Sequence, residues 1–318
     1  MRLFITGGAG FIGSNFVRLT LDLGYEVTVY DSLTYAGNLS SLQDLNSKAE
    51  YRFVKGDICD LEQLRSTMRE HDAVVHFAAE SHVDRSISGP HDFVRTNCTG
   101  TNLVMFVAKE LSIDRVIHIS TDEVYGQIAE GSFKESDPLD PRSPYSASKA
   151  GSDLIALSYF STFNLPVIVT RSSNNFGPYQ YPEKVIPLFV TNLMEGHKVP
   201  LYGKGMNIRD WCYVEDNCRA IELVLREGIE GEIYNIGAGS EITNRDLTQR
   251  ILELMNRDES MIELVADRLG HDQRYSVDTS KIEKLGWKPS HDFDSALLST
   301  VDWYKNNRWW WEPLTSVQ

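Results

Sequence analysis

The sequence of 318 residues has no long hydrophobic run. No stretch approaches the roughly 18 to 20 consecutive apolar residues that cross a bilayer. The N-terminus "MRLFITGGAG" holds too few apolar residues before its glycines to form the core of a signal peptide. We therefore expect a cytoplasmic protein with no membrane contact.

Basic charge is also scarce. The chain has 45 acidic and 31 basic residues, for a formal net charge of −14. A surface this acidic disfavours nucleic acids and anionic membranes as partners. It still allows a small anionic ligand, because such a ligand needs only a local cluster of cations.

Cysteine and histidine are few and scattered. The four cysteines, Cys59, Cys98, Cys212 and Cys218, form no C-x-x-C pair, and the eight histidines form no H-x-x-x-H pair. We expect reduced thiols, as in a cytosolic protein, and no metal site.

The first half of the sequence alternates between strand-like and helix-like stretches. Apolar, β-branched runs at 2–6, 26–30, 51–54, 73–78, 115–120 and 166–171 alternate with helical stretches, among them 13–23, 60–70, 92–111 and 145–163. This pattern predicts an α/β fold with a Rossmann-type doubly wound parallel sheet over residues 1–172. The looser pattern of 173–318 predicts a smaller C-terminal substrate-binding domain, with one return of the chain to the sheet around 210–240.

A glycine-rich turn follows the first strand. Gly8, Gly10 and Gly13 have G-x-G-x-x-G spacing, and Gly7 gives an overlapping G-x-x-G-x-x-G frame. A glycine-rich turn can have a purely structural role. Here, however, the second strand ends at Asp31, an acid that suits the ribose hydroxyls of NAD and repels the extra phosphate of NADP. The combination predicts a dinucleotide site for NAD, with Asp57 and Ile58 as neighbours of the adenine ring.

Tyr145 and Lys149 lie four residues apart in "SPYSASKAGSD" (143–153). At the start of a helix they share one face. They could be a solvated pair. Alternatively, the ammonium of Lys149 and a positive nicotinamide ring lower the pKa of the Tyr145 phenol until it acts as a base near neutrality. The preceding glycine motif favours this second interpretation.

Two acids, Asp122 and Glu123, stand side by side just after the strand at 115–120. Like charges this close raise each other's pKa, and a pair of carboxyls with separated pKa values can supply both an acid and a base. The alternative is that Asp122 caps a helix while Glu123 is solvated.

Taken together, "TGGAGFIG", "STDEVYG" and "YSASK" resemble the extended short-chain dehydrogenase/reductase family, the NAD-dependent epimerases and dehydratases of nucleotide sugars. The blocks "DSLTYAGNL", "FAAESHVDRSI", "RSSNNFGPYQYPEKVIPLF" and "ADRLGHDQRY" narrow the resemblance to the dTDP-glucose 4,6-dehydratases, from residue 2 to the closing "WWEPL". The resemblance implies a lyase that forms dTDP-4-keto-6-deoxyglucose and water through an internal NAD hydride cycle. It also implies a homodimer that pairs the helices at 92–111 and 145–163.

The resemblance further implies roles for individual residues. Tyr145, with Lys149, accepts the proton of the sugar 4-hydroxyl, Glu123 removes the proton on carbon 5, Asp122 protonates the departing 6-hydroxyl, and Thr121 hydrogen-bonds near the 4-hydroxyl. The implied cofactor contacts are Gly7, Gly10, Phe11, Ile12, Gly13, Asp31, Ser32, Leu33, Thr34, Asp57, Ile58, Phe77, Ala78, Ala79, Thr96, Tyr145, Lys149 and Asn175. The implied substrate contacts are Ser81, Thr121, Asn174, Lys184, Val185, Pro200, Leu201, Tyr202, Arg209, Asn244, Arg268, His271 and Asp272.

Two other functions remain open at this point. An epimerase or decarboxylase of the same fold would keep Tyr145 and Lys149 but leave the paired acids without a task. A non-catalytic NAD-binding scaffold would need none of the four. The choice between thymidine and uridine is also open, because one methyl group is worth only about 1 kcal/mol in a pocket. For "RWWWEP" (308–313) we expect packing of the tail with one ring partly exposed, and the sequence offers no functional account of it.

Overall fold

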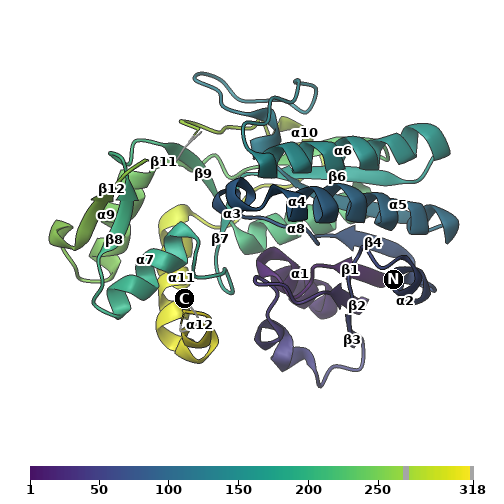
Figure 1. Cartoon of the computed structure of the whole chain (residues 1–318), viewed down its shortest axis with the longest axis horizontal. Coiled ribbons are helices and arrows are strands. Elements are labelled where there is room, and N and C mark those ends of the chain that lie inside the picture. Colours follow the sequence, from purple (N-terminus) through teal and green to yellow (C-terminus); the bar gives the residue numbers. More distant parts are fainter. Residues whose placement is uncertain (268–271, 316–318) are drawn as a thin grey trace.

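A seven-stranded parallel sheet forms the centre of the molecule (Figure 1). The computed structural model describes residues 1–267 and 272–315. The strand order is β10-β6-β5-β4-β1-β2-β3. The strands are Arg2–Thr6 (β1), Glu26–Asp31 (β2), Tyr51–Lys55 (β3), Ala73–His76 (β4), Arg115–Thr121 (β5), Val167–Ser172 (β6) and Ile233–Ile236 (β10). The doubly wound parallel sheet expected from the sequence is confirmed.

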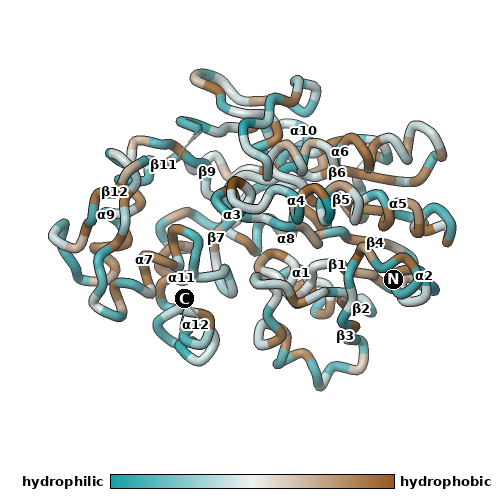
Figure 2. The backbone as a smooth tube through the Cα atoms, viewed as in Figure 1, coloured by the Kyte–Doolittle hydropathy of each residue, from teal (hydrophilic) through white to brown (hydrophobic). Residues whose placement is uncertain are grey.

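The sheet is buried on both faces, which explains why its strands are apolar without strict alternation. All four residues of β4 and all six of β6 are buried, and the central strands are brown in the hydropathy view (Figure 2). One face packs against α1 (Phe11–Asp22) and α8 (Val214–Glu227), and the other against α2 (Leu61–Met68), α5 (Thr101–Glu110) and α6 (Pro144–Phe163).

The helix expected over 92–111 is interrupted. The structure has α4 (Pro90–Phe93), a π-helical turn (Val94–Gly100) and then α5. Inside the π turn the buried Asn97 amide accepts a hydrogen bond from the Glu80 backbone N–H at 2.8 Å, and it donates to the Glu80 carbonyl and to Ser148 Oγ. The wider turn thus ties this helix to the segment after β4 and to α6, as π turns near functional sites often do.

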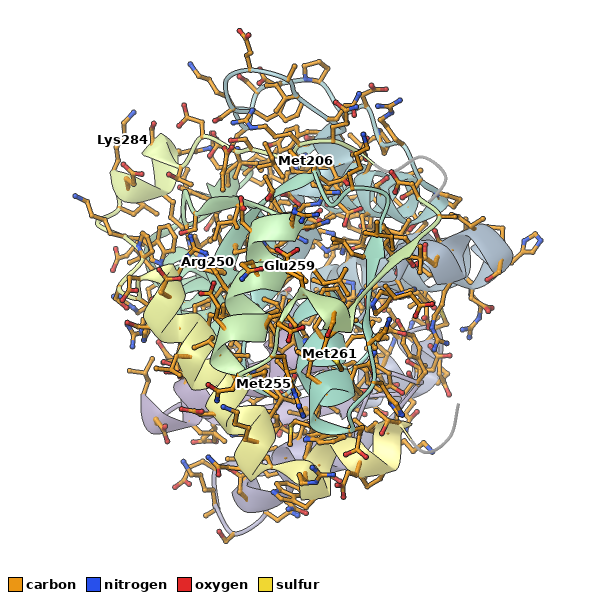
Figure 3. All side chains as sticks on the ribbon, turned by 90° about the vertical axis from the view of Figure 1, so that its left-hand side faces the viewer. Met206, Arg250, Met255, Glu259, Met261 and Lys284 are labelled. Carbon is orange, nitrogen blue, oxygen red and sulfur yellow. The ribbon has the colours of Figure 1, made fainter. Side chains whose placement is uncertain are left out.

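The remaining elements form a smaller lobe. Its strands pair in the order β11-β9-β7 and as β12-β8. They are Asn174–Phe176 (β7), Val199–Tyr202 (β8), Ile208–Tyr213 (β9), Glu241–Thr243 (β11) and Ile262–Val265 (β12), with helices Val185–Met194 (α7), Asn244–Leu254 (α9), Phe293–Asn306 (α11) and Arg308–Thr315 (α12). Figure 3 looks onto the outer end of this lobe, where Arg250 on α9 forms an ion pair with Asp294 on α11.

The chain returns to the central sheet after entering the smaller lobe. Helix α8 packs on β5 and β6, and β10 pairs in parallel with β6. We propose a domain division near residue 172, with residues 214–236 belonging structurally to the first domain. Short helical segments complete the chain: Leu39–Leu45 (η1), Val83–Ser88 (α3), Asp122–Tyr125 (η3), Glu259–Met261 (η4) and Ser280–Glu283 (α10).

Parallel strands bring their carboxyl ends to one edge of the sheet. The glycine turn after β1, Asp31 at the end of β2, the segment after β4, the paired acids after β5 and Asn174 after β6 therefore all meet there. Among residues 1–267 and 272–315, no helix combines the length and apolar character that a membrane crossing requires.

Candidate active site

A cavity of about 570 Å³ lies at this edge. It contains every expected cofactor contact except Leu33. Of the expected catalytic residues, the cavity wall includes Thr121, Asp122, Glu123, Tyr145 and Lys149. One cavity therefore joins the dinucleotide motif with the tyrosine, the lysine and the two acids.

Two of the three glycines that line the cavity in this turn, Gly7 and Gly13, have no room for a side chain. Gly7 has a φ of +71°, and a Cβ added there would lie 2.5 Å from the Ala78 backbone nitrogen. A Cβ on Gly13 would collide with the Gly7 carbonyl. Gly8 instead packs against Val29, away from the cavity wall. The glycines on the cavity wall are thus those of the G-x-x-G-x-x-G frame from Gly7, not of the G-x-G-x-x-G frame from Gly8. Helix α1 begins within this frame, at Phe11, with Gly10 as its N-cap.

Asp31 is held firmly at the end of β2. Its Oδ2 accepts a hydrogen bond from the Ala9 backbone N–H at 2.9 Å, and its Oδ1 accepts one from Leu33 at 2.8 Å. Leu33 has a φ of 56° and is not part of the cavity wall, so its expected cofactor contact is absent from the described geometry. A buried carboxylate at this place suits a pair of ribose hydroxyls and disfavours an added phosphate.

Asp57, expected beside the adenine, is also fixed. Its Oδ1 accepts from the Cys59 N–H at 2.8 Å, and its Oδ2 forms an ion pair with Arg95 at 2.7 Å. Arg95 lines the cavity and had not been identified from the sequence.

Helix α6 presents Tyr145 and Lys149 in its first two turns. Ser143 starts the helix with a reciprocal capping box to Ser146, and Pro144 occupies the first turn. The buried Lys149 Nζ donates to the Ile119 carbonyl on β5 at 2.6 Å. Burial lowers the pKa of Lys149 to about 8, while the nearby Asp153 carboxylate acts in the opposite direction.

In the chain by itself the pKa of Tyr145 is raised well above its ordinary value of 10.0. The expected lowering, which includes the charge of a bound nicotinamide ring, stays a prediction. Burial is the largest cause, and the charges of Glu123 and Asp122 add to it, whereas a hydrogen bond with Thr121 opposes it. The sequence interpretation weighed only the cations near the phenol. Folding places two acids and little water around it, and these disfavour the phenolate.

The acids follow β5 in a short 3-10 helix. Thr121, not Asp122, is its N-cap: Thr121 Oγ1 accepts from the Glu123 N–H at 3.3 Å and donates to Asp122 Oδ1 at 3.2 Å. Asp122 is 3% exposed, and within the described residues its Oδ2 has no hydrogen-bond partner. Burial, together with the charges of Glu123 and Asp210, raises the pKa of Asp122 to about 8. At neutral pH this carboxyl therefore keeps a proton.

The expected substrate contacts within the described residues divide into two groups. Ser81, Thr121, Asn174 and Lys184 lie on the cavity wall, with Lys184 Nζ 3.2 Å from the Ser81 carbonyl. The cavity wall does not include Val185, Pro200, Leu201, Tyr202, Arg209, Asn244 or Asp272. Arg268 and His271 lie outside the described residues.

Arg209, one of the residues outside the cavity wall, has a structural role. Its guanidinium is buried, donates to the Asp272 carbonyl at 2.9 Å and stacks 4.3 Å from the centre of the Tyr275 ring. It therefore holds the chain at 272–275 in place beside the lobe.

The cavity also contains residues that sequence reasoning missed. Among them are Glu80, Gln180, Tyr181 and Glu183. The last three stand in the block "NNFGPYQYPEKVIPL", from which the sequence predicts only Asn174, Asn175, Lys184 and Val185 as contacts. Their proximity to those residues was the only available signal.

Comparison with known proteins agrees with this geometry. A sequence model of the family described as GDP-mannose 4,6 dehydratase matches residues 4–300. The chain belongs to this family of sugar-nucleotide 4,6-dehydratases. Among the family's members, the dTDP-glucose 4,6-dehydratase of Streptomyces niveus is 52% identical, over 99% of this chain and 96% of its own. The low-salt glycan biosynthesis protein Agl12 of Haloferax volcanii is also 52% identical, over 96% and 98%.

Solved structures of 4,6-dehydratases have the same fold. The dTDP-glucose 4,6-dehydratase DesIV of Streptomyces venezuelae, crystallised with NAD and dTDP, superposes with a TM-score of 0.97 at 55% identity, covering 99% of this chain and 100% of that one. The UDP-glucose 4-epimerase of Thermotoga maritima has a TM-score of 0.90 but only 28% identity, over 96% and 99%. The fold is thus shared with epimerases, whereas the sequence is much closer to the dehydratases.

Proposed function

We propose that this chain is a dTDP-glucose 4,6-dehydratase, a hydro-lyase that converts dTDP-glucose to dTDP-4-keto-6-deoxyglucose and water. The observation that carries the proposal is the pair Asp122–Glu123 in the same cavity as Tyr145 and Lys149. An elimination across two neighbouring carbons needs a proton donor and a proton acceptor close together, and these acids provide both.

NAD is the cofactor that the cavity fits. The glycine turn leaves its backbone open to a pyrophosphate, α1 begins beside it, and Asp31 suits the ribose. NAD held by this turn and by Asp31 would supply a reversible hydride acceptor for the oxidation at carbon 4 and the reduction at carbon 6.

The chain's own residues move the protons. Tyr145 accepts the proton of the 4-hydroxyl. Since burial raises its pKa, it needs a positive charge nearby, and Lys149, one helical turn away on α6, carries one. The resulting 4-ketone acidifies the carbon-5 hydrogen, which Glu123 removes. Asp122, whose raised pKa keeps it protonated, gives its proton to the departing 6-hydroxyl.

The same residues argue against the alternatives. An epimerase has no use for a second, protonated acid beside Glu123, and a binding scaffold has no use for Tyr145 and Lys149 in the cavity. Incubation with dTDP-glucose and mass spectrometry of the product separates the three. Loss of one water supports dehydration, an unchanged mass with altered stereochemistry supports epimerisation, and unchanged substrate supports the scaffold.

A closed hydride cycle predicts that turnover leaves no reduced nicotinamide behind. Each hydride taken from carbon 4 returns to carbon 6 of the same sugar, so no second substrate is needed to reoxidise the cofactor. Absorbance of reduced nicotinamide should therefore stay flat while dTDP-glucose is consumed. Reduced nicotinamide that accumulates in proportion to product would contradict the proposal.

We also propose a homodimer formed through the π turn and α6. Three large apolar side chains on these helices are exposed: Val94, Leu154 and Phe163, at 55%, 61% and 51%. The expected result is twice the chain mass by light scattering at micromolar concentration. Leu154→Glu should shift the protein to monomers, whereas Leu298→Glu on α11, also at an exposed leucine, should not. A wild-type monomer would rule this interface out.

The cytoplasmic location and the substrate contacts outside the cavity wall stay predictions. Thymidine is the proposed base, because two of the relatives described above, at 52% and 55% identity, are named as dTDP-glucose enzymes. Competition between dTDP and UDP for the site tests that preference directly.

A further inference from the structure

The turn that leads into the cavity at 178–184 contains a strained residue. Tyr179 has a φ of 65°, a left-handed conformation that is unfavourable for a bulky side chain. Such a conformation persists only where its surroundings hold it. Gly177, two residues earlier, also has a positive φ, of 146°.

An aromatic box from the C-terminus holds the Tyr179 ring. Its centre lies 4.6 Å from that of Trp303 on α11 and 5.6 Å from that of Trp310 on α12. The two tryptophan rings are themselves 5.3 Å apart in an edge-to-face arrangement. Trp310, the middle residue of the three-tryptophan run, is 2% exposed.

Residues of the first domain contact the Tyr179 ring and its turn from the other side. Arg18 on α1 lies over the Tyr179 ring at 4.2 Å, and Asn15 Nδ2 donates to the Pro178 carbonyl at 3.0 Å. Trp310 Nε1 donates to Ser41 Oγ in η1, also at 3.0 Å. Helix α12 thus connects the smaller lobe with the segment after β2, across 269 residues of sequence.

The residues just after this turn form part of the cavity wall. The Gln180 carbonyl accepts a hydrogen bond from the Tyr304 hydroxyl, and its Nε2 donates to the Asn175 carbonyl at 2.9 Å. Gln180, Tyr181, Glu183 and Lys184 all line the cavity. The position of this wall therefore depends on the turn at Tyr179.

We propose that Trp310 is a positioning residue for the nucleotide sugar: it clamps the strained turn at Tyr179 and so sets the place of Gln180–Lys184 in the cavity wall. This gives the tryptophan run a task for which the sequence offered no account. The proposal rests on the proposed function only for the identity of the ligand, dTDP-glucose. The clamp itself is a property of the fold.

The matched test compares Trp310→Phe with Trp309→Phe. Trp309 belongs to the same run and helix but is 47% exposed and bonds only Asn307 among the described residues. In Trp310→Phe, the affinity for dTDP measured by calorimetry should fall about tenfold, and KM for dTDP-glucose should rise by a similar factor. We expect kcat within about twofold of wild type and unchanged NAD affinity. Trp309→Phe should match wild type throughout.

A second pair of variants, at Tyr179, distinguishes the loss of this ring packing from a general loss of stability. Tyr179→Phe keeps the ring in the box and should bind dTDP normally, whereas Tyr179→Leu removes the ring and should reproduce Trp310→Phe. Hydrogen exchange of the amides at 178–184 should speed up in Trp310→Phe and Tyr179→Leu alone, with the sheet amides unaffected.

The outcomes separate the two proposals. A wild-type protein that binds no dTDP contradicts the proposed function, and exchange at 178–184 then decides the clamp alone. If wild type binds dTDP, equal affinity in Trp310→Phe overturns the positioning role whatever the exchange shows. An equal loss in Trp309→Phe overturns it as well, because the effect would then belong to the helix as a whole.

Discussion

Glu123→Gln should lower turnover of dTDP-glucose by about 10²- to 10⁴-fold, the usual contribution of a positioned general base. The amide keeps the size and hydrogen-bonding shape of the side chain but cannot accept the carbon-5 proton. The Thr121 cap on the residue-123 backbone N–H remains, so the short helix should keep its geometry.

The loss of activity in Glu123→Gln should affect only the steps that follow oxidation at carbon 4. Oxidation at carbon 4 depends on Tyr145 and Lys149 and should survive, so addition of dTDP-glucose to the variant should produce enzyme-bound reduced nicotinamide. Exchange of the carbon-5 hydrogen with solvent deuterium should slow together with turnover. Tyr145→Phe is the control, since it should block the first step and give no reduced nicotinamide.

Near-normal turnover of Glu123→Gln would remove this residue as the base. So would the absence of reduced nicotinamide in both variants, because Tyr145 and Glu123 would then serve the same step.

Asp122→Asn should also reduce turnover by about 10²- to 10⁴-fold, but at a different step. The carbon-5 hydrogen can still be removed by Glu123, so its exchange with solvent should continue. The 6-hydroxyl leaves poorly without its proton donor, so exchange should outpace product formation. If exchange of the carbon-5 hydrogen slowed as much as turnover, the separate roles of Glu123 as base and Asp122 as acid would be contradicted.

The stability of Asp122→Asn also tests whether the buried Asp122 carboxyl is protonated. The pKa of Asp122 rises from an ordinary 3.8 to about 8 on folding, so over that range the folded chain binds a proton that the unfolded chain has lost. Stability therefore falls as pH rises from about 4 to 8, on the order of 1 kcal/mol per pH unit from this group. Asn does not titrate, so the variant should lose this dependence.

Chemical denaturation at several pH values between 5 and 8 measures this dependence of stability on pH. The stability of Asp122→Asn relative to wild type should increase with pH across that window. A difference between wild type and Asp122→Asn that does not change with pH would show that Asp122 titrates normally.

The sequence by itself determined the sheet, the dinucleotide turn and the residues that chemistry needs at the strand ends. These features are local: a β-α alternation, a glycine spacing and a Y-x-x-x-K pair each span few residues, and parallel strands must bring their carboxyl ends together. That is why Asp31, Asp122 and Tyr145, chosen from separate motifs, lie on the wall of one cavity.

Only the tertiary structure decided which glycine frame faces the cavity, the direction of the Tyr145 pKa in the chain by itself and the partner of Trp310. Gly8 and Gly7 are equivalent by spacing, and only the packing of Val29 and Ala78 separates them. A pKa depends on burial and on charges brought in from other elements, which spacing does not contain. The bond from Trp310 to Ser41 joins residues 269 positions apart, and no local pattern specifies such a contact.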